Sequence, residues 1–224
     1  MERKNLFKTK NNIYRGEYEF YYTSPSEGPG VMFDTTPVSE EYDESTGDGL
    51  WTFDDPPTAI ICSNQSGLNH YCTYMSLPTT ITYIGDGACR NIYSNLYVDV
   101  DFSNVTYVGD IAFESANISN FPTFENGVNI GSSAFVNCTF GNSNIANLYI
   151  YYAENSSIGY RAFYNSNIAG VDLIHNDLSS TDLCTVGSEA FEKCSVTTVY
   201  ISPTPFSRRY RSDSDWQATG LNIQ

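Results

Sequence analysis

The chain has 224 residues, of which 15% are aromatic and only 17% are charged. A chain of this length can bury a substantial core, and its aromatic content, with 18 tyrosines, favours a β-rich fold over disorder. The 26 acidic and 11 basic residues give a formal net charge of −15, which argues against nucleic acid or an anionic membrane as the main partner.

Basic residues are concentrated at the start of the chain. Between Gly16 and Ser207 there are only three basic residues against 23 acidic ones, whereas the first 15 positions hold five basic residues. Such a basic head is suited to docking on an acidic neighbour in an assembly or on a second copy of the chain, and a solvated terminus is the alternative interpretation. The residues expected to dock are Arg3, Lys4, Lys8, Lys10 and Arg15.

Residues 1–60 are expected to form a non-repeating N-terminal arm. Residues 13–23 alternate as a strand does, whereas residues 24–49 are rich in Pro, Gly and acidic side chains, which is typical of a loop. Residues 50–53 contain two large aromatic side chains. Because the ends of a repeat array need a cover, we expect this segment to cap the first coil of the array that follows.

One pattern occurs five times between residues 84 and 191: an aliphatic residue, Gly, two variable residues, Ala, and then an aromatic residue or Cys. The motif glycines are 24, 22, 28 and 28 residues apart, an interval typical of short units that stack to bury a shared core. The glycine is expected to permit an unusual backbone angle, and the phenylalanine to fill the gap between coils. The residues that define the repeats are Gly85, Gly109, Gly131, Gly159, Gly187, Phe113, Phe135, Phe163 and Phe191, with Cys89 in place of the first aromatic residue.

Alternating apolar residues behind the motif predict short strands with one face inward. Stacking is expected to pair these strands into one parallel sheet. Ahead of the first complete repeat, Cys72, Met75 and Leu77 are expected to form the closing strand of an incomplete repeat whose first half is missing. The inward positions of the last three repeats are Leu148 and Ile150, Val171 and Leu173, and Val199 and Ile201.

The solvent side of this strand ladder is the predicted ligand-binding surface. The residue between the two inward positions is Tyr149, Asp172 or Tyr200, and Tyr97 is expected to join them from the first repeat. Tyrosine offers a large contact area and a hydroxyl group at low entropic cost. The structural alternative is that these tyrosines are favoured strand residues that pack on their neighbours.

The spacing and residue types resemble the BspA-type leucine-rich repeat, whose unit reads approximately L-x-x-I-x-I-P-x-x-V-x-x-I-G-x-x-A-F-x-x-C. Residues 75–88 and 157–163 follow this pattern closely, and the resemblance covers about residues 72–206. It implies a β-rich leucine-rich-repeat solenoid of short parallel strands joined by turns or short helices. The expected organisation is an arm (1–60), a solenoid of five repeats and a partial one (61–206), and a tail (207–224). Such modules usually serve non-enzymatic interactions on surface proteins of host-associated bacteria and some protists, and in their phages.

Few residues suggest catalysis. His70 with Cys72 lacks a third group that would orient the pair, and no cleft signature surrounds the paired carboxylates that could act as acid and base. We therefore predict no catalytic residue, with an unrecognised active site in residues 1–60 as the alternative. The carboxylate pairs are Asp54 with Asp55 and Asp99 with Asp101.

Metal binding and disulfides have equally weak support. Asp86 and Asp110 share one repeat position, but no known calcium motif surrounds them, so we predict no metal site and no cofactor. The cysteines lack a clustered disulfide framework, and three of them fall at repeat positions, so we expect small buried side chains. The six are Cys62, Cys72, Cys89, Cys138, Cys184 and Cys194.

The favoured function is a phage virion component, such as a head-fibre, decoration or tail protein, that docks by its basic head and presents the solenoid for binding. No stretch reaches the roughly 18 apolar residues of a membrane span, and the first seven residues lack the apolar core of a secretory signal, which argues against ordinary export if Met1 is the native start. The alternative is a bacterial cell-surface adhesin that binds a host protein or glycan.

Overall fold

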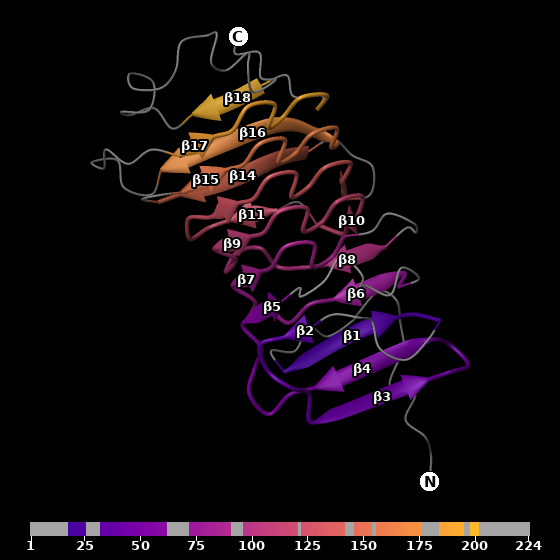
Figure 1. Ribbon diagram of the computed structural model, residues 1–224. Coiled ribbons are helices and arrows are strands. Elements are labelled where there is room, and N and C mark those ends of the chain that lie inside the picture. The colour runs from indigo at the N-terminus through magenta and orange to yellow at the C-terminus, as the bar shows by residue number, and fades with distance from the viewer. Residues whose placement is uncertain are drawn as a thin grey trace.

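The computed structural model describes residues 18–25, 32–61, 72–90, 96–120, 122–141, 146–153, 156–175, 184–194 and 198–201. Within these ranges the chain forms short strands joined by turns and no helix, and so no helix that could span a bilayer. Figure 1 shows the strands stacked one above another, from β3 and β4 at one end to β18 at the other. The prediction of a β-rich leucine-rich-repeat solenoid is confirmed.

The strands form three sheets, so the prediction of one parallel sheet is wrong. Each coil of the solenoid contributes strands to different sides of the stack, because turns redirect the chain within each repeat. Sheet A contains, in spatial order, β13 (Thr139–Phe140), β10 (Asn117–Ile118), β8 (Tyr97–Asp99), β6 (Tyr74–Ser76), β1 (Glu19–Thr23), β4 (Asp48–Thr52) and β3 (Ser39–Asp43). Sheet B contains β17 (Thr185–Val186), β15 (Ser157–Ile158), β12 (Asn129–Ile130), β9 (Tyr107–Val108), β7 (Tyr83–Ile84), β5 (Ala59–Ile61) and β2 (Met32–Phe33). Sheet C contains β11 (Thr123–Phe124), β14 (Ala146–Tyr152), β16 (Ile168–His175) and β18 (Thr198–Ile201).

An antiparallel cap covers the first coil. Strand β4 pairs antiparallel with β1 on one side and β3 on the other, and β1 pairs antiparallel with β6, the first solenoid strand of sheet A. The prediction that residues 24–49 form a loop is wrong, since they contain β2, β3 and the start of β4. The acidic sequence of β3 lacks apolar alternation because this strand lies at the edge of its sheet and is largely exposed.

Aromatic rings fill the core of the cap, and Tyr21 of β1 packs against Tyr74 of the solenoid strand β6 with ring centroids 5.7 Å apart. Trp51 and Phe53, from the segment expected to cap the array, lie in a cluster of edge-on and stacked rings. The other members are Phe20, Tyr22, Phe33 and Tyr42. The solenoid ladder begins at β5, which pairs parallel with β7 and supplies the half of the first repeat that was expected to be missing.

Four of the five motif glycines, Gly109, Gly131, Gly159 and Gly187, are required by the close approach of coils. None of the five has a positive φ, so the prediction that they take an unusual backbone angle is wrong. The amide of Gly159 donates to the carbonyl of Ile130 in the preceding coil at 2.7 Å. A Cβ atom on Gly159 would lie 2.5 Å from the carbonyl carbon of Gly131, a distance that real Cβ atoms do not show. Positive φ angles instead recur two residues after each motif glycine, at Gly87, Ile111, Ser133, Arg161 and Glu189, and again six residues after the last four, at Ser115, Asn137, Asn165 and Lys193.

The motif phenylalanines form one continuous stack through the core. Successive ring centroids lie 5.1, 4.9 and 5.3 Å apart, and the rings are within 6° of parallel. All four rings are fully buried, and the motif alanines beside them are buried as well. The stack consists of Phe113, Phe135, Phe163 and Phe191.

Candidate functional site

The outer face of sheet C carries the residues predicted to bind a ligand. Strands β14 and β16 pair in parallel over seven residue positions, and this register places Tyr149 beside Asp172 and Asp172 beside Tyr200. The flanking residues point inward, and Leu148, Ile150, Val171 and Leu173 are all fully buried. Tyr149 is 38% exposed. The backbone of Tyr200 belongs to β18, but its side chain lies outside the described part.

Tyr97 does not lie in this ladder. It belongs to β8 of sheet A, where its register partners are Tyr74 and Asn117. The distance of Tyr97 along the chain from its motif alanine, Ala88, led to the wrong prediction that Tyr97 lies in the sheet C ladder. The chain between Ala88 and Tyr97 is longer than the chain between Ala112 and Asn117, so a sheet A residue falls at the spacing of a sheet C residue. Tyr97 is 49% exposed, on a different sheet from Tyr149.

Asp172 has a buried carboxylate oxygen without a hydrogen-bond partner. Its Oδ1 atom is inaccessible to solvent and accepts no hydrogen bond, whereas the side chain as a whole is only partly buried. Partial burial raises the pKa of the Asp172 carboxyl group above its usual range. A buried acceptor left unpaired costs about 1–3 kcal/mol, so this carboxylate is held on the face of sheet C at a free-energy cost.

A second pair of tyrosines lies on sheet B, where Tyr83 is exposed and Tyr107 is partly buried. The rings of Tyr83 and Tyr107 are stacked with centroids 4.6 Å apart. Partial burial and the nearby carboxylates of Asp86 and Asp110 raise the pKa of Tyr107. These two tyrosines fall just before the motif, outside the strand frame used for sheet C, and the sequence-based reasoning missed them.

The carboxylates of Asp86 and Asp110 bind backbone amides of the next coil. Asp86 Oδ1 accepts from the amide of Asp110 at 2.9 Å, and Asp110 Oδ1 accepts from the amide of Ser132 at 2.6 Å. The recurrence of Asp at this position therefore has a structural cause in the stacking of coils. Among the residues that the structure describes, no group of three His, Cys, Asp or Glu side chains is placed to hold a metal ion.

A cluster of cations and tyrosines lies on the turns that carry the motif. The guanidinium of Arg161 lies 5.0 Å from the ring centres of both Tyr160 and Tyr164, and its Nε donates to Glu189 at 2.5 Å. Lys193 Nζ lies 4.9 Å from the centre of the Tyr164 ring. The signal in the sequence is the pair of tyrosines one and five residues after Gly159, which no other repeat contains.

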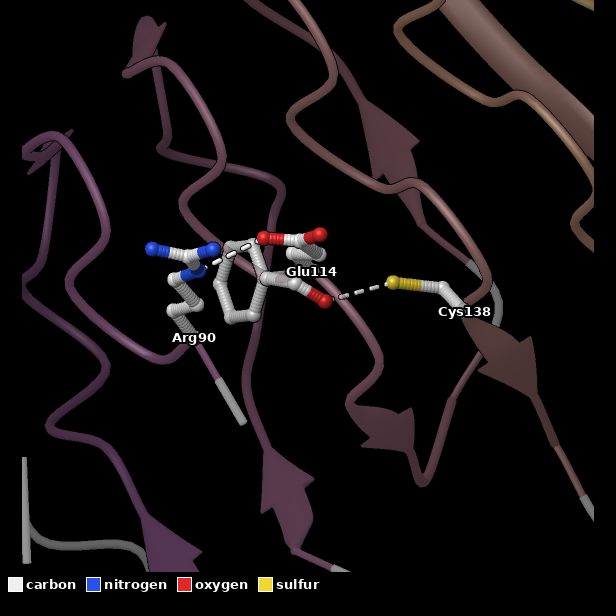
Figure 2. A network of polar contacts seen from close by, with 4 residues as sticks. Arg90, Glu114 and Cys138 are labelled. Atoms are coloured by element: carbon white, nitrogen blue, oxygen red, sulfur yellow. Dashed lines mark hydrogen bonds and ion pairs between the residues drawn. The ribbon is translucent and has the colours of Figure 1, made fainter. Parts of the chain in front are cut away.

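Two of the cysteines at repeat positions, Cys138 and Cys194, link neighbouring coils. Cys138 donates its thiol hydrogen to the carbonyl of Phe113 at 2.7 Å, and Cys194 donates to the carbonyl of Phe163 at 2.8 Å. Figure 2 shows Cys138 reaching back to the preceding coil, near the ion pair in which Arg90 Nε lies 2.6 Å from Glu114. The five cysteines in the described ranges are thiols, and Cys62 lies outside these ranges.

These thiols are expected to resist alkylation in the folded protein. Burial raises the pKa of Cys72 and of Cys194 to about 11 and that of Cys138 further. A rise of two units in the pKa of a thiol lowers its reactive thiolate fraction at pH 8 about 100-fold. Peptide-resolved mass spectrometry after iodoacetamide treatment should show these three cysteines reacting at least about 100-fold more slowly in the native protein than in urea. Equal rates in the two conditions would contradict the burial.

The carboxylates considered for catalysis lie in two parts of the chain, one pair after β4 and the other at the end of β8. Asp54 and Asp55 are exposed in the segment that follows β4. Asp99 accepts from Ser119 Oγ at 2.7 Å, whereas Asp101 accepts from the backbone amide of Ser103. His70, the basic head (Arg3, Lys4, Lys8, Lys10 and Arg15) and the tail 207–224 lie outside the described residues, as does the side chain of His175.

Comparison with protein families gives one match. The model of the "BspA type Leucine rich repeat region" matches in six copies, over residues 66–180 and 139–209. The matched residues make up more than half of the chain and include every strand of sheet C. No curated protein and no solved structure matches the chain.

Proposed function

Because this chain belongs to the BspA-type leucine-rich repeat family, we propose that it is a non-enzymatic interaction protein whose binding surface is the outer face of sheet C. The family is built for interaction or structural roles. The narrower assignment to sheet C rests on this chain's own residues.

The observation that carries the proposal is the pairing of Tyr149 with Asp172. One residue is an exposed aromatic side chain, and the other is a carboxylate whose buried oxygen has no hydrogen-bond partner. Aromatic side chains are enriched at recognition surfaces, and the Asp172 side chain, which is only partly buried, adds a carboxylate beside the Tyr149 ring. Strands β14 and β16 present them on the longest strands of the solenoid.

Truncation of Tyr149 tests the surface. We expect Tyr149→Ala to weaken binding to immobilised glycans or matrix proteins at least about tenfold, because truncation of a central tyrosine removes much of the binding energy of an interface. Surface plasmon resonance on a panel of both ligand types measures the change. Tyr83→Ala is the matched control, since Tyr83 is 40% exposed but lies on sheet B. Equal affinities for the wild type and Tyr149→Ala would remove sheet C as the binding surface.

The setting that we propose is a phage virion, in which the basic head docks the chain onto the particle; the alternative setting is a bacterial cell surface. The supporting feature is the separation of charge between the basic first 15 residues and the acidic body, since opposite charges steer association. Mass spectrometry of purified particles and of cell envelopes distinguishes the two settings. Detection in envelopes but not in particles would contradict the virion setting.

A further inference from the structure

The Asp172 carboxylate lacks a cationic partner among the described residues. Its pKa is raised by partial burial, and no neighbouring charge contributes to the shift. A carboxylate removed from water is stabilised by a charge-assisted hydrogen bond from a cation. The three basic side chains in the described ranges are engaged elsewhere: Arg90 with Glu114, Arg161 with Glu189, and Lys193 over Tyr164.

The turns of the same solenoid contain a cation that contacts both aromatic rings and a carboxylate. Arg161 lies over the rings of Tyr160 and Tyr164 and pairs with the carboxylate of Glu189. A guanidinium gains from both contacts, since the ring face attracts the cation and the carboxylate accepts its hydrogen bonds. On sheet C, Tyr149 and Asp172 supply a ring and a carboxylate on adjacent strands. The missing component is the cation.

We propose that the outer face of sheet C docks the basic N-terminal segment of a second copy of this chain, with a lysine or arginine side chain bound at Tyr149 and Asp172. The inference rests on the proposed function of this face as a binding surface. Charge complementarity identifies the occupant. Residues 1–15 contain five basic residues and one acidic residue, whereas in residues 207–224 two acidic residues offset three basic ones.

The positions of the basic N-terminal segment and of the outer face of sheet C determine the form of the assembly. Strand β1, which follows the basic segment in the chain, and strand β16, which carries Asp172, lie toward opposite ends of the solenoid (Figure 1). Contact between the segment of one copy and sheet C of the next uses two different surfaces. Such a heterologous contact builds rings or open chains of subunits.

A labelled peptide of residues 1–17 tests the docking, with fluorescence anisotropy as the readout and the full chain held at a concentration where it is monomeric. We expect Asp172→Asn and Tyr149→Ala each to weaken peptide binding at least about tenfold. Glu41→Gln is the matched control, because Glu41 is an exposed acidic residue on β3 and its loss should change the affinity by less than about twofold. A peptide with glutamine at its five basic positions should not bind.

Light scattering of the full chain gives an independent readout. The mass of the wild type should rise with concentration, and Asp172→Asn should remain a monomer with an unchanged circular dichroism spectrum. Asp172→Glu keeps the charge and should restore both association and peptide binding. A wild type that stays monomeric at all concentrations would overturn the inference.

Three peptide results would also overturn it. These are equal peptide affinities for the wild type and Asp172→Asn, a larger loss in Glu41→Gln, and tighter binding of a peptide covering residues 205–217. Each leaves the proposed function standing if Tyr149→Ala still loses binding to glycans or matrix proteins. Loss of that effect removes the proposed function by itself.

Discussion

Replacement of Gly159 by alanine is expected to lower the free energy of unfolding by about 3 kcal/mol. The new Cβ atom would lie 2.5 to 2.7 Å from Gly131 C, Gly131 O and Ser132 N, which are backbone atoms of the preceding coil. These atoms cannot retreat without lengthening the bond from the Gly159 amide to Ile130 O, which sets the spacing of the coils. Urea denaturation followed by circular dichroism measures the loss.

Two variants separate this steric cause from a conformational one. Gly87→Ala places a side chain at a φ of +62° but meets no atom closer than 4.0 Å, so it should cost only about 1–2 kcal/mol. Ser133→Gly removes a side chain from a φ of +56° and should leave the stability unchanged or raise it by up to about 1 kcal/mol. If Gly159→Ala lost no more stability than Gly87→Ala, close coil contact would not be the reason for the motif glycine.

The inward face of the solenoid could be predicted because burial leaves a periodic trace in the sequence. Leu148, Ile150, Val171 and Leu173 alternate with polar or aromatic residues, and their spacing from the motif alanine is regular enough to align the last repeats. The register of Tyr149 with Asp172 follows from the same alignment. The prediction holds for the repeats that share this spacing and fails for Tyr97 of the first repeat, whose spacing differs.

The number of sheets, the positive φ positions and the unpaired oxygen of Asp172 leave no comparable pattern in the sequence. The number of sheets depends on where each coil turns, and residues two after the motif glycine take positive φ whether they are Ile111, Ser133 or Arg161. Hydrogen bonds between coils over-determine this conformation, so tertiary context overrides residue preference. The unpaired oxygen of Asp172 depends on what surrounds one atom, which no spacing rule encodes.

Truncation of Phe135 to alanine is expected to cost about 3–5 kcal/mol of unfolding free energy, the largest loss among these variants. Its ring is fully buried, with Phe113 at 5.1 Å and Phe163 at 4.9 Å on its two faces. Three more rings, Phe102, Phe124 and Phe140, lie within 6.4 Å of it. Urea denaturation measures the loss, and near-ultraviolet circular dichroism reports on the packing of the remaining rings.

The size of this effect depends on whether the neighbouring coils can close the cavity. The amide of Phe113 donates to Ala134 O and that of Phe135 donates to Ala162 O, both at 2.7 Å, so the backbone bonds on either side hold the coils at a fixed spacing. Phe135→Leu refills most of the volume and should cost less than about 1.5 kcal/mol. A loss below about 1 kcal/mol for Phe135→Ala would mean that the coils collapse onto the gap. In a solenoid stabilised by contacts between adjacent coils, a cavity at this central position weakens both of its interfaces at once.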